Sequence, residues 1–343
     1  MKKFRMIEKI PDSMRENLDF LGQANCPIKD RFSRAWEEFA ATYNAGHQTQ
    51  IRGVVPMGGC GTDIYCNIST VTDRKKFPQV VTDTGYQEFF TGNFLSSPEK
   101  LGWFGSPVRN DTVHPLCRGH SLSDPRGIFH VFGAMPHVIL VNHRRLGGRA
   151  VPRRVADLTS AQYSGSLGTG FAEDDITELL LLEIWKEQGR AGIRALARNI
   201  GFAGRRQDMA SDAVAHRDGC CVYLMSWFLA HAVPRRDYLE IIWPEDGAIL
   251  NPLYALFKKP ETAREDEVQE ACASFLFGRE LGQSLADGWF AHVHPEIRYG
   301  LPPDAKFRWV GWDYILEKPL ASRVREIEKV YYDERRRDIS IAS

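Results

Sequence analysis

The sequence predicts an α/β protein of two lobes joined by a hinge, with each lobe built as a mixed sheet flanked by helices. Three observations carry this prediction. The chain has 343 residues, of which 43% are hydrophobic and 26% charged, as in globular proteins of about two domains. A strand, a loop and a helix follow one another three times before residue 92. Residues 136–168 then read as a buried strand that enters a second lobe, a Gly-Gly turn, and a short strand that ends at a Gly-rich loop.

The first lobe begins with alternating strands and helices. An apolar strand is expected at residues 18–22, and Asp30 is a suitable N-cap for a helix that Gly46 can end. The apolar residues of that helix recur at helical spacing: Phe32, Trp36, Phe39, Ala40 and Tyr43. Further strands are expected at residues 50–57 and 79–82, each followed by a loop and a helix.

The second lobe follows a crossing of the chain. Residues 127–142 read as two strands with a break at 133–136, and the second strand is the crossing. A helix is expected from near Asp174, a buried strand at 220–225 and a return strand at 238–243. A later amphipathic helix has its expected buried face at Val268, Ala271, Cys272, Phe275 and Leu276.

These elements divide the chain into five segments. Residues 1–17 are a polar N-terminal lead-in, and residues 18–136 form the first part of lobe one. Lobe two is expected to span residues 137–243. The chain then returns to lobe one over residues 244–318 and ends in a C-terminal helix or tail at 319–343.

Charge and composition exclude two classes of partner. The chain has 44 basic residues (Lys and Arg) and 44 acidic ones (Asp and Glu), so it has no net positive charge that would favour binding to nucleic acid. No apolar run has the ~18–20 residues of a membrane span, so membrane insertion is not expected. The Gly-x-Ser-x-Gly, His-Glu-x-x-His and P-loop motifs are all missing, which favours a non-catalytic protein.

The N-terminal residues and the cysteines bear on the compartment. The first ten residues are interrupted by charge and contain no apolar core of a signal peptide. The seven cysteines are odd in number and resemble no disulfide framework. A cytoplasmic protein is therefore expected. The alternative is a periplasmic protein whose signal peptide has been removed.

The order of several short segments resembles the type II periplasmic-binding-protein, or Venus-flytrap, fold. The closest similarity is to substrate-binding proteins of iron(III)-type ABC importers. The resemblance implies a small ligand in an interlobe cleft, hinge closure, and an ABC importer permease as partner if the protein is exported. The matching segments are 138–142, 146–148, 151–152, 156–158, 163–165, 246–249, 251–252 and 275–283.

The iron ligands of that family do not carry over. Its ferric branch uses a pair of adjacent tyrosines in lobe two. The corresponding region here, residues 222–227, contains only Tyr223. The chain's one tyrosine pair, Tyr331-Tyr332, lies near the C-terminus. A ferric site of the usual kind is therefore not expected.

Candidate ligand contacts follow from the fold. In open α/β sheets, ligands bind beyond the carboxyl ends of strands, where helix N-termini present free amides. Five segments meet this rule. They contribute Cys26 and Lys29; Gly58, Gly59 and Cys60; Thr84 and Tyr86; Thr169, with Ser226 and Trp227 nearby; and Asp246, Gly247 and Ala248. Each segment could also be an ordinary turn with a helix cap.

Cysteines and histidines suggest a second kind of function. Cys26 and Cys60 lie in two of these segments, and a thiol at a helix N-terminus can be reactive, although both could equally be small core residues. His114, Cys117 and His120 have the spacing of metal ligands but lack a fourth partner in sequence.

The expected function is therefore that of a solute-binding protein that holds a small polar or anionic ligand. The alternative is an intracellular metal- or sulfur-handling protein or enzyme that uses the cysteines of the same cleft. No cofactor is predicted, and a bound metal ion is left open.

Overall fold

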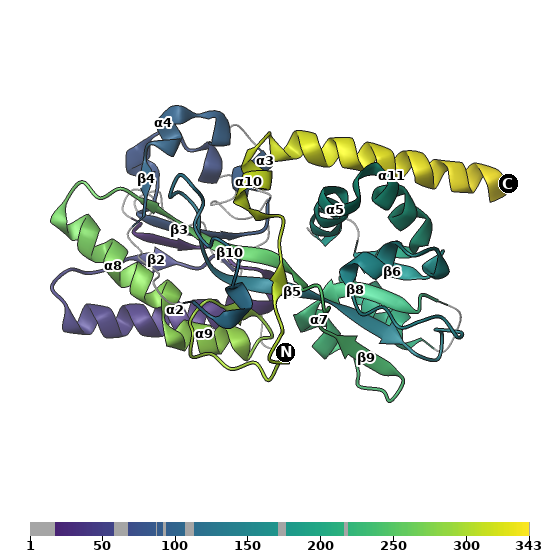
Figure 1. The fold of residues 1–343 in the computed structure, drawn as a ribbon. Helices are drawn as coiled ribbons and strands as arrows, with labels where there is room; N and C mark the ends of the chain where they lie inside the picture. Colours follow the sequence, from purple (N-terminus) through teal and green to yellow (C-terminus); the bar gives the residue numbers. More distant parts are fainter. Residues whose placement is uncertain are drawn as a thin grey trace. The chain divides into compact units, whose positions relative to one another are not determined.

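The computed structural model describes residues 18–57, 68–86, 88–91, 94–106, 113–170, 176–215 and 219–342 (Figure 1). The chain forms two compact units. Unit 1 consists of Met1–His114, Ser121–Ala134 and Pro252–Tyr299. Unit 2 consists of Pro115–His120, Met135–Asn251 and Gly300–Ser343.

The sheet of unit 1 is mixed. Its elements are β1 (Phe20–Gly22), β2 (Gly53–Val54), β3 (Val80–Thr84), β4 (Phe104–Gly105), β11 (Ala291–His292) and parts of β5 (His130–Asn142) and β10 (Ala248–Lys258). The first three strands are parallel in the order β2-β1-β3, and β10 runs antiparallel to β3. The predicted parallel pairing of these strands is confirmed, whereas the loop and helix predicted directly after residue 57 lie outside the described residues.

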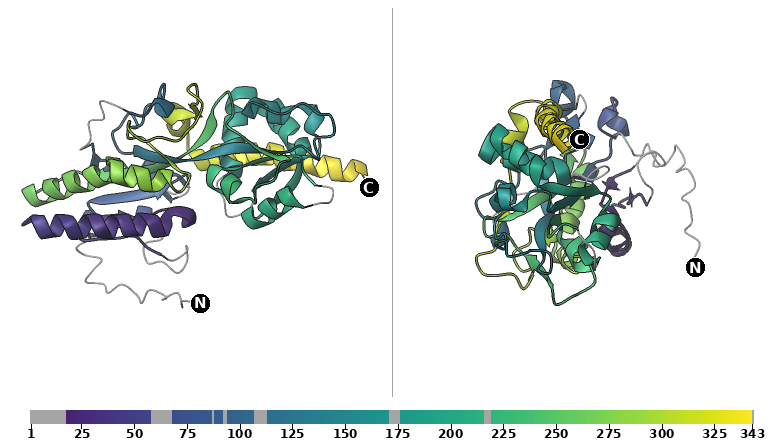
Figure 2. Two further views of the ribbon diagram at one scale, coloured as in Figure 1. Left: turned by 90° about the horizontal axis from the view of Figure 1, so that it is seen from below. Right: turned by 90° about the vertical axis from the view of Figure 1, so that its right-hand side faces the viewer.

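Helices of unit 1 pack beside this sheet. They are α2 (Cys26–Gly46), α3 (Glu88–Thr91), α4 (Pro98–Leu101), α8 (Ala263–Phe277) and α9 (Arg279–Ala286). The long helices α2 and α8 lie side by side, as both ribbon views show (Figure 2). Trp36 of α2 stacks on Phe20 of β1 at 4.0 Å between ring centroids, and Phe275 of α8 meets the Trp36 ring edge-on at 5.3 Å. Aromatic packing therefore joins two helices to the sheet.

Unit 2 contains a second group of paired strands. They are part of β5, then β6 (Leu167–Gly170), β7 (Ile200–Gly204), β8 (Val222–Ser226), β9 (Leu239–Ile242) and β12 (Phe307–Arg308). The order is β9-β5-β8-β6-β7, with β6 parallel to β7 and β8 and with β5 antiparallel to β8 and β9. β12 pairs with the first two residues of β10.

The helices of unit 2 cover this sheet. They are α5 (Ile176–Asn199), α6 (Arg206–Val214), α7 (Trp227–Ala232), α10 (Gly311–Leu316) and α11 (Leu320–Ala342). α11 packs along α5 (Figure 1). Arg198 of α5 donates a hydrogen bond to the buried carboxylate of Glu334 on α11 at 2.8 Å. Six short 3-10 helices complete the described elements: η1 (Ile68–Thr70), η2 (Arg74–Lys76), η3 (Phe94–Ser96), η4 (Pro115–Cys117), η5 (Val155–Thr159) and η6 (Ala161–Tyr163).

The boundaries of the two units differ from those expected from the sequence. The chain leaves unit 1 after Ala134 and returns at Pro252, compared with expected crossings at 137 and 244. Both crossings fall inside strands, β5 and β10. Residues 300–318, expected in lobe one, belong to unit 2 because β12 pairs with β10 there and α10 leads into α11.

Three expected elements have different limits. Residues 130–142 form one strand, not two, because Pro136 lies between a stretch paired with β11 and a stretch paired with β8, so its missing N–H is tolerated. α2 begins at Cys26, with Asn25 as N-cap and Pro27 in the first turn, where proline is favoured. The strand expected at 50–57 is reduced to β2, two residues long.

Candidate functional site

Two of the predicted ligand segments leave the same edge of the unit 1 sheet. β1 and β3 are parallel with Gly22 opposite Thr82, so the residues that follow each strand lie close together. The Thr82 hydroxyl donates to the carbonyl oxygen of Gln23 at 2.8 Å and ties the two strand ends to each other. This edge corresponds to the carboxyl ends of parallel strands, where ligands of open α/β sheets bind.

Two polar atoms at this edge lack hydrogen bonds. Asn25 Oδ1 and Thr84 Oγ1 are both buried and have no hydrogen-bond partner among the described residues. Asparagine is a favoured N-cap, yet the Asn25 side chain makes no capping bond to α2. A buried polar atom without a partner costs about 1–3 kcal/mol, so these two atoms are available for a ligand or for water. Thr84 is a predicted site residue, and Asn25 directly precedes the predicted contact Cys26.

The other candidates of unit 1 differ in exposure. Cys26 is exposed at the first position of α2, and Lys29 is half-buried one turn later. Tyr86 is only 1% exposed and meets Phe90 edge-on at 5.6 Å, which places its ring in the core. Gly58, Gly59 and Cys60 lie outside the described residues, so their role as ligand contacts stays a prediction.

Unit 2 presents a similar edge. β6 and β8 are parallel with Thr169 opposite Leu224, and Ser226 at the end of β8 is opposite His137 of β5. Because residues in register share a face and alternate residues repeat it, Thr169, Ser226 and His137 lie on one face of the sheet. Thr169 is 1% exposed, and its buried Oγ1 finds no hydrogen-bond partner within the described part of the chain. This hydroxyl is the counterpart of Thr84.

Two candidates next to Thr169 have structural roles. The Ser226 hydroxyl accepts the backbone N–H of Leu229 at 3.3 Å and so caps α7. Trp227 is buried and meets Trp243 edge-on at 5.4 Å. The side chain of Ser226 is therefore committed to a helix cap, and that of Trp227 to packing.

The segment Asp246-Gly247-Ala248 is a structural turn. One Asp246 carboxylate oxygen accepts the N–H of Val155 at 2.8 Å, and the other accepts a hydrogen bond from Arg308 at 2.6 Å. Gly247 has φ of 109°, a conformation that favours glycine. Ala248 is buried in β10. The predicted ligand role of these residues is not supported, because the Asp246 carboxylate is already occupied.

Arg308 is a feature that the sequence did not reveal. Its guanidinium also contacts Glu183 at 2.9 Å and Glu187 at 2.6 Å, both on α5. Burial alone would lower the pKa of Arg308, but Glu183 and Glu187 raise that pKa overall. The cluster joins β12, α5 and the Asp246 turn within unit 2.

The candidate metal ligands His114, Cys117 and His120 have other surroundings in the structure. The His114 ring is within 3.1 Å of the carbonyl oxygen of Ile297, and the His120 ring within 3.0 Å of that of Phe307. Cys117 is buried, and burial raises the pKa of its thiol to about 12. Over the described ranges, no three His, Cys, Asp or Glu side chains come together as metal ligands.

The tyrosines also bear on metal binding. Tyr223, the single tyrosine of the region that resembles the ferric site, is buried, and its hydroxyl donates to Asp212 at 2.5 Å. Burial, with the Asp212 contact, raises the pKa of Tyr223. The pair Tyr331-Tyr332 lies on α11, with the first ring buried and the second exposed. The Tyr223 hydroxyl is thus committed to Asp212.

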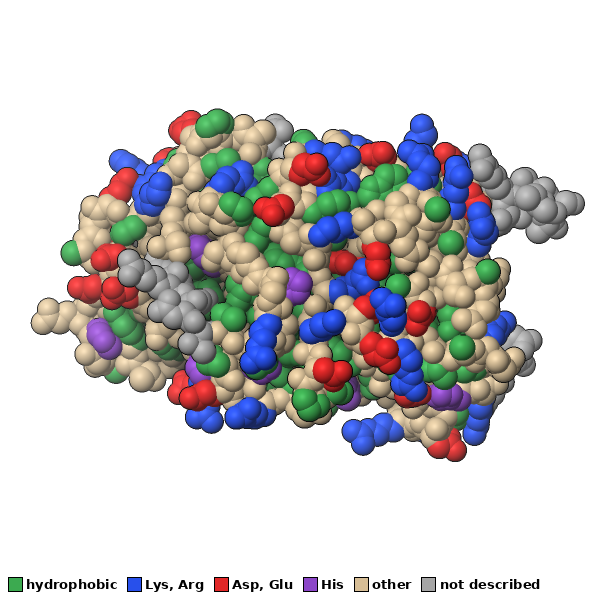
Figure 3. All heavy atoms as spheres, viewed as in Figure 1, with side chains coloured by type: hydrophobic (Ala, Val, Ile, Leu, Met, Phe, Trp, Pro, Cys, Tyr) green, Lys and Arg blue, Asp and Glu red, His purple; other side chains and the backbone are tan. Residues whose placement is uncertain are grey.

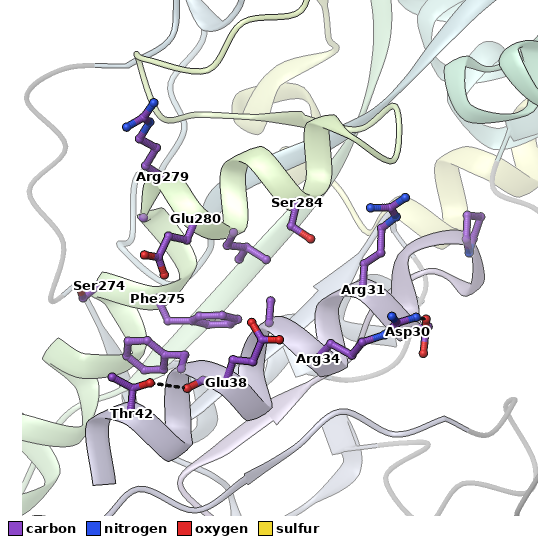
Figure 4. Close-up of a pocket in the computed structure, with 15 residues that line it drawn as sticks. Asp30, Arg31, Arg34, Glu38, Thr42, Ser274, Phe275, Arg279, Glu280 and Ser284 are labelled. Atoms are coloured by element: carbon purple, nitrogen blue, oxygen red, sulfur yellow. Dashed lines mark hydrogen bonds and ion pairs between the residues drawn. The ribbon is translucent and has the colours of Figure 1, made fainter. Parts of the chain in front are cut away.

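Unit 1 also contains a groove of about 980 Å³. It runs between α2 and the α8–α9 pair (Figure 4), and Phe39 and Phe275 are among its lining residues. Its rim carries charges of both signs, including an ion pair between Asp30 and Arg34. The groove therefore has no dominant charge to select a ligand. A smaller hollow of about 280 Å³ lies in unit 2 beside β9.

On the face drawn in Figure 3, acidic and basic side chains are interspersed. Within the described part of the chain, none of the helices combines the length and apolar character that a bilayer span requires.

The comparisons with known proteins agree with this fold. Residues 75–318 match the family model of the bacterial extracellular solute-binding proteins. The Bordetella ferric binding protein superimposes with a TM-score of 0.62 at 12% identity, covering 92% of this chain and 98% of its own. The ferric binding protein of Campylobacter jejuni gives a TM-score of 0.59 at 14% identity, covering 92% of this chain and 98% of its own. The Trichodesmium protein IdiA (FutA), solved with iron and citrate, gives 0.60 at 11% identity with the same coverage.

Among curated proteins, none matches this chain. The matched family is described as extracellular, so the expectation of a cytoplasmic protein is not supported. The structural neighbours establish the fold alone at such low identity, whereas the family model covers well over half of the chain. The chain belongs to the family of bacterial extracellular solute-binding proteins and has the type II periplasmic-binding-protein fold.

Proposed function

We propose that this protein is the exported solute-binding component of an ABC importer and that it carries a small polar or anionic solute. The observation that carries the proposal is the set of buried, unpartnered polar atoms at the carboxyl ends of parallel strands. These are Asn25 Oδ1 and Thr84 Oγ1 in unit 1 and Thr169 Oγ1 in unit 2. The two hydroxyls can donate hydrogen bonds to solute oxygens, whereas Asn25 Oδ1 can only accept one, from an O–H or N–H of the solute.

Each unit supplies part of the proposed contact set. The edge in unit 1 adds the N-terminus of α2, a helix of 21 residues whose first amides suit an anion. The strands β5 and β10 carry the chain between the units. Solute binding is proposed to favour a closed arrangement about these strands, to an extent set by its differential affinity for the two states.

The structural neighbours suggest iron as a solute. Two of them are named as ferric binding proteins, and a third was solved with iron and citrate. In this chain, the described residues bring no three His, Cys, Asp or Glu side chains together. We therefore propose that any iron is carried as an anionic carboxylate complex, which is one member of the polar, anionic class. Free ferric ion bound by protein side chains alone is the competing outcome.

A binding panel tests the proposal. Isothermal titration with phosphate, sulfate, citrate, ferric citrate and a sugar phosphate is expected to reveal at least one tight ligand. Small-angle scattering is expected to show compaction with that ligand only. Thr169→Val and Thr84→Val each remove one unpartnered hydroxyl and are expected to weaken binding about tenfold, or about 1.4 kcal/mol.

Thr82→Val is the matched control, since its hydroxyl is already bonded to Gln23 and is not offered to a solute. Equal weakening in all three variants would remove the support for a role of the unpartnered hydroxyls. Failure of the whole panel to bind would count against a polar, anionic solute.

A further inference from the structure

The strand β9 forms an open edge of the sheet in unit 2. β9 pairs with β5, and no other described strand pairs with it. Proteins usually protect such edges, because unpaired backbone groups can pair with another chain. In Figure 1, β9 lies at the rim of this sheet.

The register shows which backbone groups face outward. The N–H of His143 bonds the carbonyl of Tyr238 at 2.8 Å, so this directly opposed pair is a hydrogen-bonded pair. Such pairs alternate along an antiparallel ladder, and Glu240 and Ile242 therefore also bond toward β5. The backbone of Ile241 consequently points to the open edge.

A hollow lies next to the same edge. It measures about 280 Å³, well above the ~30 Å³ share of one water molecule. Leu140, Ala230, Val233, Leu239 and Ile241 provide its apolar walls. Ile241 is 37% exposed, one of three large apolar side chains exposed to this degree among the described residues. An apolar side chain of an added strand would find a complementary surface here.

The rim of the hollow is cationic. Arg235 and Arg236 line it and are exposed, and no ion pair with a carboxylate is found for either among the described residues. The nearby Asp237 is within 3.8 Å of Arg144 instead. Two unneutralised guanidinium groups beside an apolar hollow favour a partner with carboxylates. They also disfavour a second copy of this chain, which would bring four arginines together.

We propose that β9 is a docking edge for an extended, acidic segment of a protein partner. The segment would add as a strand to β9, place an apolar side chain in the hollow, and set carboxylates against Arg235 and Arg236. This surface does not depend on the solute proposed above, since it lies wholly in unit 2 and contains neither Thr169 nor Ser226.

The probe is a blocked peptide that alternates valine and threonine and carries two glutamates at each end. Wild-type protein is expected to bind it in fluorescence polarisation, with loss of affinity as salt rises. Backbone hydrogen exchange at the Ile241 amide is expected to slow in the complex. Ile241→Pro removes the outward N–H without removing a bond to β5, and is expected to abolish binding.

The double variant Arg235→Glu, Arg236→Glu is expected to weaken binding at least tenfold. Its matched control, Arg325→Glu with Lys329→Glu on α11, is expected to stay within twofold of wild type. If Ile241→Pro does not fold, as judged by circular dichroism, the charge-reversal pair decides the question. Equal binding of a peptide with lysines in place of glutamates, unchanged exchange at Ile241, or dimerisation of the protein through β9 would each overturn the proposal.

Discussion

Two kinds of region, both predicted as ligand segments, differ in how their buried polar groups are satisfied. At the strand ends, the hydroxyls of Thr84 and Thr169 are buried and make no hydrogen bond to any residue that the structure describes. At the Asp246 turn, the carboxylate accepts backbone amides and the Arg308 guanidinium. The difference teaches that position after a strand does not identify a ligand contact. Hydrogen bonding within the protein separates groups that hold the fold together from groups that remain available to a solute.

The largest expected change in unfolding free energy is at the Asp246 turn, where the carboxylate is already hydrogen-bonded within the protein. Arg308→Met leaves Asp246 and the buried Glu183 without their cation, so the free energy of unfolding is expected to fall by about 3–5 kcal/mol. Urea denaturation measures the change, and the exposed Arg325→Met, with an expected change within about 0.5 kcal/mol, is the control. A loss below about 1 kcal/mol would show that the cluster is not a main support of the turn.

His292 in unit 1 is a second side chain whose polar atoms are hydrogen-bonded within the protein, and its contribution to stability depends on pH. Its Nε2 is 2.8 Å from the carbonyl of Leu276, and its Nδ1 accepts the N–H of His294 at 3.1 Å. Burial lowers the pKa of His292 to about 4. The unfolded state therefore binds the proton first, and stability is expected to be lost as pH falls from about 6.5 to about 4, by about 3 kcal/mol in total.

Denaturation across this pH range checks the prediction for His292. His292→Gln keeps a polar side chain that does not titrate, and its stability curve is expected to lack this component. Identical pH slopes for the variant and the wild type would rule out a contribution from this ring.

Removing an unpartnered hydroxyl is expected to raise the free energy of unfolding, whereas removing a hydrogen-bonded one is expected to lower it. Thr169→Val removes a buried polar atom that has no partner, so unfolding free energy is expected to rise by about 1 kcal/mol while solute binding weakens. Thr82→Val breaks the hydrogen bond to Gln23 and is expected to lower the unfolding free energy by about 1 kcal/mol. Melting temperatures and binding constants measured on the same samples separate the two cases. Destabilisation by Thr169→Val would mean that this hydroxyl already has a partner inside the protein.

The smallest effect concerns Cys26, which follows Asn25 at the start of α2. Cys26 is exposed, whereas Cys117, Cys220, Cys221 and Cys272 are buried, so Cys26 is expected to be alkylated first among these five. Peptide mapping by mass spectrometry after a short exposure to iodoacetamide measures this order. Protection of Cys26 by a bound solute would place that solute near Asn25, and unchanged reactivity would separate the solute from this end of α2.

Much of the fold could be predicted because its signals are local. Apolar strands followed by loops and helices predicted the parallel arrangement of β2, β1 and β3. The break expected at 133–136 was wrong because tertiary pairing on either side of Pro136 keeps the strand extended. Asn25 shows the same limit at the site. Its residue type predicts a helix cap, yet its side-chain oxygen remains buried and unpartnered.

The sequence by itself determined the order of the elements, the candidate loops after the strands, and the absence of a tyrosine pair at residues 222–227. These properties depend on residue type and on spacings within one element. Only the tertiary structure decided which candidate groups are satisfied, because their partners come from distant parts of the chain. Arg308 reaches Asp246 across 62 positions and Glu183 across 125. No local pattern marks such a partner, and its presence or absence separates the Asp246 turn from the hydroxyls of Thr84 and Thr169.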